Sequence, residues 1–166
     1  GYSPLAWMFY DRGVNNKINK IHERALRYVY QNETLSFEDL LKMDESVTIH
    51  HRNIQHLAIE MFKAKHGLGT EIMDAVFIRP SNADRIQTRS SVNNDFFLPQ
   101  VNTVHYGHDS LRYFGCKIWG LVPDWIKLSP GVLQFKSAIK GWIPESCPCR
   151  LCSDYIAGVG YVNLVD

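Results

Sequence analysis

The sequence lacks the charge excess, the long apolar runs and the catalytic signatures that mark many functional classes. A net charge of +1 over 166 residues excludes a uniformly basic nucleic-acid coat, so any binding surface must come from local clustering of charge. No uncharged apolar run approaches the roughly 18 residues of a membrane span, so no membrane partner is expected. The chain has no glycine-rich phosphate loop, no G-x-S-x-G elbow and no H-E-x-x-H pair.

Cysteine is also scarce, with four residues, and three of them cluster as Cys147, Cys149 and Cys152. A disulfide framework is therefore a poor interpretation, and reduced thiols inside the cell fit better. Three thiols within six residues resemble part of a zinc site, and zinc needs four ligands. A metal-free cluster of reduced thiols is the alternative, and the spacing does not decide between them. Candidates for a fourth ligand are distant in sequence: His105, His108 and Cys116.

Helical periodicity predicts a mainly α fold: one helical domain of five or six helices, with a short strand or two, a long polar loop and a Cys-rich tail. The domain is expected at 1–142 and the tail, with its zinc site, at 143–166. A short strand is expected where Val101, Thr103 and His105 alternate. The predicted helices lie at about 14–30, 36–41, 47–66, 70–77, 110–121 and 130–142.

Capping residues support several of these helices. Ser36 and Asp39 have the spacing of a capping box, and Thr70 is a good N-cap. Gly67 is a C-terminal stop. Ser129 is predicted to cap the last helix, with Pro130 in its first turn.

The helix at 14–30 carries two stripes. The apolar one is expected to be buried, and it comprises Val14, Ile18, Ile21, Ala25, Leu26 and Val29. The basic one comprises Lys17, Lys20, Arg24 and Arg27, with Glu23 to one side. Such a stripe is either a solvated helix face or a contact for nucleic-acid backbone, and the pattern leaves both open.

The connection at 78–100 is polar and unusually long for a compact domain. Its arginines, Arg79, Arg85 and Arg89, are candidates for phosphate contacts, and a solvated linker is the alternative.

Histidine and tryptophan have competing interpretations. His50 and His51 fall near the buried face of the helix at 47–66, where a structural role is favoured over metal binding. The tryptophans suit either base stacking or the core, and the core is favoured for Trp119, Trp125 and Trp142.

Several segments, taken in order, resemble the region downstream of the polymerase core in non-LTR (LINE-type) retrotransposon proteins of invertebrates. They are SPLAWMF at 3–9, NNKINKIHERALR at 15–27, SFEDLL at 36–41, TIHHRNI at 48–54, YFGCKIW at 113–119, VP at 122–123 and CPCRLC at 147–152. The family usually has proline at the position of Cys116 and often cysteine at that of Ser3, so Cys116 is not carried over as a zinc ligand.

The resemblance implies a C-terminal, non-catalytic portion of a reverse transcriptase, an RNA-directed DNA polymerase. The chain would bind template RNA or target DNA, or support the polymerase thumb, with the upstream polymerase domain as a partner and a location in cytoplasm and nucleus. The Mg²⁺ of the parent enzyme needs paired carboxylates, and this chain has no Asp-Asp dipeptide. No residue here is therefore expected to be catalytic.

Two other classes are kept as alternatives. One is a protein–protein interaction module without nucleic-acid binding, an orphaned or domesticated fragment. The other is a metal-dependent nuclease that uses the histidines and Asp109, although no carboxylate cluster accompanies them.

Overall fold

The structure, a computed structural model, describes residue 5 and residues 12–79, 95–99, 102 and 110–144. These ranges hold seven helices and no strand, which confirms the mainly α prediction. The predicted strand at Val101, Thr103 and His105 and the tail from 145 lie outside the described residues. The helices are α1 (Arg12–Tyr30), α2 (Phe37–Met43), α3 (Ile49–Lys65), α4 (Glu71–Val76), α5 (Leu111–Leu121), α6 (Asp124–Lys127) and α7 (Val132–Ile139).

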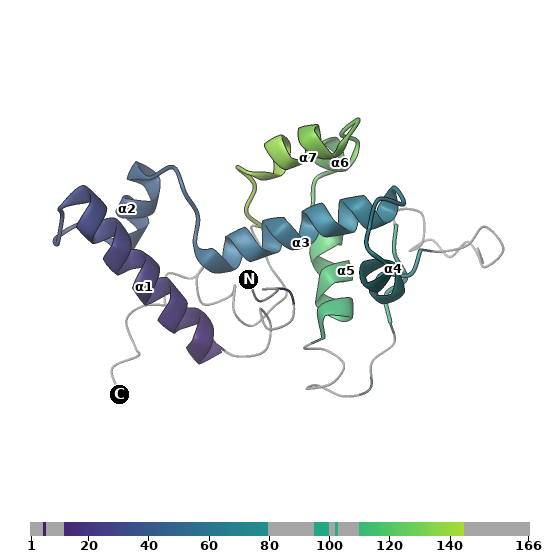
Figure 1. The fold of residues 1–166 in the computed structure, drawn as a ribbon, viewed down its shortest axis with the longest axis horizontal. Helices are drawn as coiled ribbons and strands as arrows, with labels where there is room; N and C mark the ends of the chain where they lie inside the picture. Colours follow the sequence, from purple (N-terminus) through teal and green to yellow (C-terminus); the bar gives the residue numbers. More distant parts are fainter. Residues whose placement is uncertain (1–4, 6–11, 80–94, 100–101, 103–109, 145–166) are drawn as a thin grey trace.

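Helix α3 is the axis of the fold, with α7 on one side, α5 and α4 on the other, and α1 and α2 at its N-terminal end (Figure 1). One face of α3 is completely covered, because Ile54, Leu57, Ala58 and Met61 are fully buried. Phe62, on a neighbouring face, is also buried. A helix covered on several sides buries more than one stripe of side chains.

Aromatic contacts tie the surrounding elements to α3. Phe62 stacks on Phe135 of α7 at 4.3 Å between ring centroids, and Phe135 lies 6.1 Å from Trp119 of α5. Phe96 meets the edge of Trp119 at 5.6 Å and that of Phe77 at 5.8 Å. Trp119 is therefore a core residue, as favoured, and its indole N–H donates to Asp95 at 2.8 Å. Trp142 packs partly buried against the same core. The core prediction is wrong for Trp125, which is 68% exposed because the single turn of α6 buries Ile126 and Lys127 instead.

Three of the four predicted signals at helix ends are confirmed. Ser36 accepts from the Asp39 amide at the start of α2, and Thr70 accepts from the Met73 amide at the start of α4. Gly67 adopts a φ of +70° just after α3, a left-handed conformation that glycine tolerates best. Beyond it, the Leu68 amide donates to the Lys63 carbonyl, which closes the helix end.

The prediction for the start of α7 is wrong. Gly131 is its N-cap, so Ser129 and Pro130 precede the helix. The Ser129 hydroxyl instead donates to the Ile126 carbonyl, at the end of a four-residue helix that periodicity had not indicated. Helix α7 also ends at Ile139, before Trp142, because the chain turns there: the Trp142 amide donates to the Ile139 carbonyl.

Candidate nucleic-acid interface

Helix α1 packs with a different face inward from the one its apolar pattern predicts. Leu26 is buried, but Val14, Ile21 and Val29 are 42%, 65% and 66% exposed. The buried positions are instead mostly asparagines: Asn15, Asn16 and Asn19.

The reason for this orientation is the contact between α1 and α2. Leu26 joins a small core cluster with Phe37, Leu40 and Leu41 of α2, and Tyr30 packs against it. The Tyr30 hydroxyl donates to the Asp44 carboxylate at 3.0 Å. These residues lie on the same side of α1 as Asn19, so that side faces inward and most of the apolar stripe faces out.

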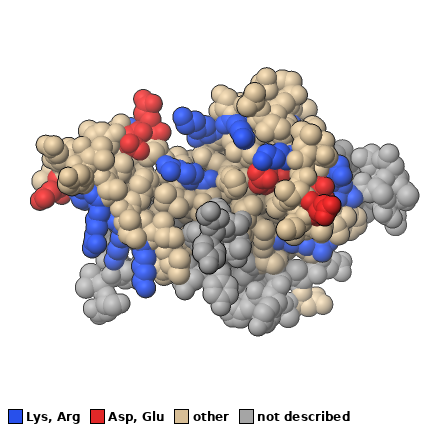
Figure 2. Space-filling model, viewed as in Figure 1, with Lys and Arg blue, Asp and Glu red and all other residues tan. Residues whose placement is uncertain are grey.

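Two exposed rows consequently run side by side along α1. We call Lys17, Lys20 and Arg24 the cationic row; all three side chains are exposed. On the outer face of α1 the row lies beside the apolar side chains rather than opposite them. Figure 2 shows basic side chains along the lower edge of α1. We call the neighbouring set the apolar row; it comprises the exposed residues Val14, Ile21, Ala25, Tyr28 and Val29, with the half-buried Ile18 between them.

Arg27 differs from the other cations of its stripe. Its guanidinium binds the Glu23 carboxylate through Nη2 at 2.6 Å and Nε at 3.1 Å. Its Nη1 donates to the Glu33 carbonyl in the connection to α2 at 2.8 Å. The Glu23 charge offsets that of Arg27, so we leave Arg27 out of the cationic row.

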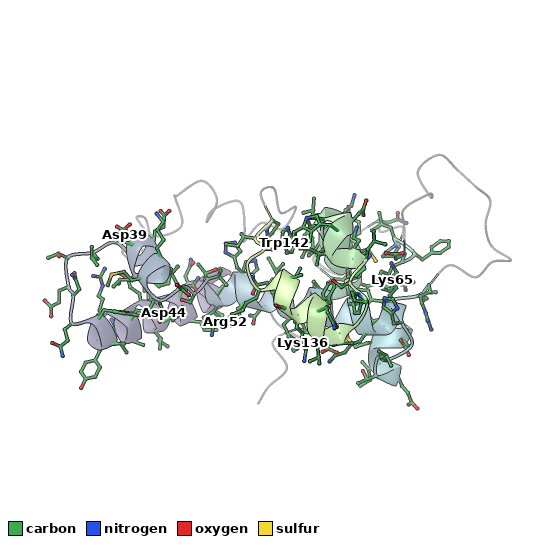
Figure 3. The ribbon with its side chains drawn as sticks, turned by 90° about the horizontal axis from the view of Figure 1, so that it is seen from above. Asp39, Asp44, Arg52, Lys65, Lys136 and Trp142 are labelled. Carbon is green, nitrogen blue, oxygen red and sulfur yellow. The ribbon has the colours of Figure 1, made fainter. Side chains whose placement is uncertain are left out.

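A second basic group, not recognised in the sequence, forms where α7 ends over the start of α3. The Gln55 side-chain amide donates to the carbonyls of Lys140 and Trp142 at 3.0 and 2.9 Å, which fixes the two segments together. Arg52, one turn before Gln55, and Lys136, one turn before Lys140, are exposed. Figure 3 labels Arg52 and Lys136 on the same side of the molecule. Lys140 is exposed as well and completes this basic group. Arg52 lies more than 80 residues from the two lysines in the sequence, so only the tertiary fold reveals the group.

The remaining predicted site residues are spread over other parts of the chain. Arg79 is exposed and donates to the Lys65 carbonyl at 3.4 Å, close to the end of α3. Arg85 and Arg89 lie outside the described residues, as do the proposed zinc ligands Cys147, Cys149 and Cys152 and the candidates His105 and His108. Those assignments therefore stay predictions.

The described part of the chain offers little for metal chemistry. It contains no group of three His, Cys, Asp or Glu side chains placed to hold a metal ion. His50 and His51 are buried, with ring centroids 6.2 Å apart and planes tilted by 47°. A pocket of about 200 Å³ lies between the 95–99 segment and α5. The Asp95 carboxylate, which lines this pocket, already pairs with Lys65 Nζ at 3.0 Å and accepts a hydrogen bond from the Trp119 indole N–H.

Among the helices that the structure describes, none combines the length and the apolar character that a membrane span requires. Comparisons of the chain with models of protein families, with curated proteins and with solved structures gave no match.

Proposed function

We propose that this chain is the C-terminal, non-catalytic region of a non-LTR retrotransposon reverse transcriptase, and that it binds RNA or DNA through the phosphate backbone. The observation that carries the binding proposal is the cationic row, because Lys17, Lys20 and Arg24 are exposed along one side of α1. Phosphate contacts of this kind position a protein on nucleic acid without reading its sequence.

The charge distribution supports the same proposal. The net charge is only +1, yet the only carboxylate of α1, that of Glu23, is bound by Arg27. Lys17, Lys20 and Arg24 cluster positive charge along one side of α1, and such clustering attracts polyanions even when the whole chain is nearly neutral. Arg52, Lys136 and Lys140 are a second set of exposed cations, where α7 ends over the start of α3.

The family assignment rests on the ordered sequence motifs, and it proposes two further properties. The upstream polymerase domain of the parent protein would supply the catalytic carboxylates and Mg²⁺, and the chain itself would be inactive. Zinc would bind the thiolates of Cys147, Cys149 and Cys152 with a fourth ligand.

One observation favours a second candidate, the protein–protein interaction module. Exposed apolar side chains that adjoin one another, as in the apolar row of α1, are typical of surfaces that another molecule covers. This candidate predicts that the cationic row is a solvated border and that the chain has no affinity for nucleic acid.

Two triple variants, each lacking three positive charges, distinguish the two candidate functions. The variant K17Q/K20Q/R24Q keeps helix propensity and the buried face of α1, and should bind labelled RNA and DNA at least about tenfold more weakly at low salt. The matched control K42Q/K63Q/K117Q removes the same formal charge from α2, α3 and α5 and should bind nearly as well as the parent. Equal binding by the parent and both variants would refute the role of the cationic row. No binding by the parent would favour the interaction module.

A further inference from the structure

The apolar row on α1 is not explained by contacts to phosphate alone. Backbone contacts need polar and cationic groups, whereas Ile21, Tyr28 and Val29 present large exposed apolar areas beside the cationic row. Tyr28 is the most exposed of these side chains, at 86%. A nucleic acid bound to α1 through its phosphates alone would leave these apolar side chains uncovered.

Tyr28 is placed in line with the cations. Lys17, Ile21, Arg24 and Tyr28 follow one another at steps of four, three and four residues, so they mark the border at which the apolar row meets the cationic row. Arg24 is one turn before Tyr28, so a guanidinium and an aromatic ring are neighbours at the exposed surface. Cations that hold the backbone and aromatic faces that stack on bases together characterise binding of single-stranded nucleic acid.

We propose that α1 binds single-stranded RNA or DNA in preference to duplex, with phosphates along the cationic row and unpaired bases over the apolar row. Tyr28 would provide the face on which a base stacks, and Ile21, Ala25 and Val29 would contact bases or sugars beside it. A duplex keeps its bases stacked inside, so it could use the cationic row but would leave the apolar row uncovered. This inference rests on the proposed nucleic-acid binding and goes beyond it by naming the strand state of the ligand.

Charge complementarity favours this occupant over a second copy of the chain. If two α1 helices packed antiparallel through their apolar rows about a two-fold axis, their cationic rows would come to the same side and repel each other. A single strand presents the opposite arrangement, with negative charge along one edge and apolar base faces along the other. Its two edges therefore match the two rows of α1.

The test compares an unstructured oligonucleotide with a duplex of equal length, by fluorescence anisotropy on the full chain. The parent should bind the single strand more tightly. Tyr28→Ala should weaken single-strand binding by roughly 5- to 150-fold, as expected for the loss of one stacked base. Duplex binding should change by less than about twofold, because phosphate contacts remain. Tyr28→Phe retains the ring and should bind like the parent. Trp125→Ala, which removes another exposed aromatic side chain on α6, is the control and should have no effect.

The two kinds of variant distinguish failure of the single-strand preference from failure of the proposed nucleic-acid binding. If K17Q/K20Q/R24Q binds both ligands as well as the parent, the proposed function fails at this surface, and the inference fails with it. If that variant loses binding while Tyr28→Ala does not, or if duplex is bound as tightly as single strand, only the present inference is overturned. Self-association of the parent that Val29→Ser abolishes would also overturn it, by showing that a second copy covers the apolar row.

Discussion

At the scale of single residues, His22 is the group whose titration is expected to affect stability. His22 belongs to α1, and its ring meets that of Phe37 in α2 edge-to-face, with the ring centroids 5.7 Å apart. Its buried Nδ1 has no hydrogen-bond partner within the described residues. Burial lowers its pKa below the ordinary 6.5, as does the positive charge of Arg52, while Asp44 opposes the shift. The folded chain therefore holds His22 neutral at a pH where the unfolded chain protonates it.

The sign of the pH effect follows from this difference. Because the unfolded state binds the proton more readily, stability is highest above the unfolded pKa of 6.5 and is lost as pH falls through it. We expect the melting temperature to drop between about pH 7.5 and pH 5.5, and His22→Gln to reduce that drop. His56→Gln, at an exposed position of α3, is the control. A pH dependence that is unchanged in His22→Gln would contradict this account.

Cys116 should be an unreactive thiol. Burial raises its pKa to about 11, and its Sγ lies 3.6 Å from the Phe97 carbonyl oxygen. The thiolate is the reactive form, so the folded chain at pH 8 should hold roughly 100-fold less of it than an unfolded chain does. Mass spectrometry of the peptide that contains Cys116 should show much slower alkylation by iodoacetamide in the folded protein than in urea. Equal rates would mean that the thiol is accessible and ionised.

The C-terminal thiols give a contrasting prediction. If Cys147, Cys149 and Cys152 bind zinc as thiolates, protein purified without chelator should contain close to one zinc per chain. Cys149→Ser should lose that metal, whereas Cys116→Ser should retain it, because the resemblance does not carry Cys116 over as a ligand. Metal-free parent protein with unchanged thermal stability would favour the cluster of reduced thiols.

At the scale of the helices, two glycines of α5 should respond to alanine in opposite directions. A Cβ on Gly115 would lie 2.5 and 2.6 Å from ring atoms of Phe77, whose side chain is buried and has no room to move away. Overpacking of this kind costs about 1–3 kcal/mol. A Cβ on Gly120 meets nothing within 4 Å, and alanine there should gain up to about 1 kcal/mol of helix propensity. Urea unfolding of the two variants measures both changes, and equal destabilisation would show that α5 packs differently.

Most of the helices could be predicted from the sequence. Six of the seven helices in the described ranges were expected, because helical periodicity and the signals at helix ends are local. Ser36, Thr70 and Gly67, for example, act within one turn of their own position. The short helix α6 was missed, since four residues are too few to show a helical period. Ser129 was assigned to the start of α7, but it also lies close to the end of α6, where its hydroxyl donates to the Ile126 carbonyl.

The orientation of α1 could not be predicted from its own pattern. Periodicity identified an apolar and a basic stripe correctly, but it assumed that the apolar one is buried. The face that packs is decided by Leu26 and Tyr30 through their contacts with α2, which are tertiary contacts. In the same way, the pairing of Arg27 with Glu23 reduced the basic stripe to three cations, and the group at Arg52 and Lys136 required α7 to fold over α3.

At the scale of the whole molecule, the chain combines a nearly neutral composition with concentrated positive charge. Helices α3, α5 and α7 share one core, and α1 and α2 form a second cluster beside it. Helix α1 can therefore present both of its outer rows to a ligand while its inner side holds it to the rest of the fold. This arrangement supports the nucleic-acid binding proposed for the chain.

The most direct test of that claim is the salt dependence of binding. Each phosphate contact releases counterions, so log K falls by roughly 0.7 to 0.9 per contact for each decade of salt. The three exposed cations of the row should give a slope of at least about −2 to −3 for the parent chain, and K17Q/K20Q/R24Q should lose that contribution. A parent that binds neither RNA nor DNA at low salt, or a variant that keeps the full slope, would contradict the account.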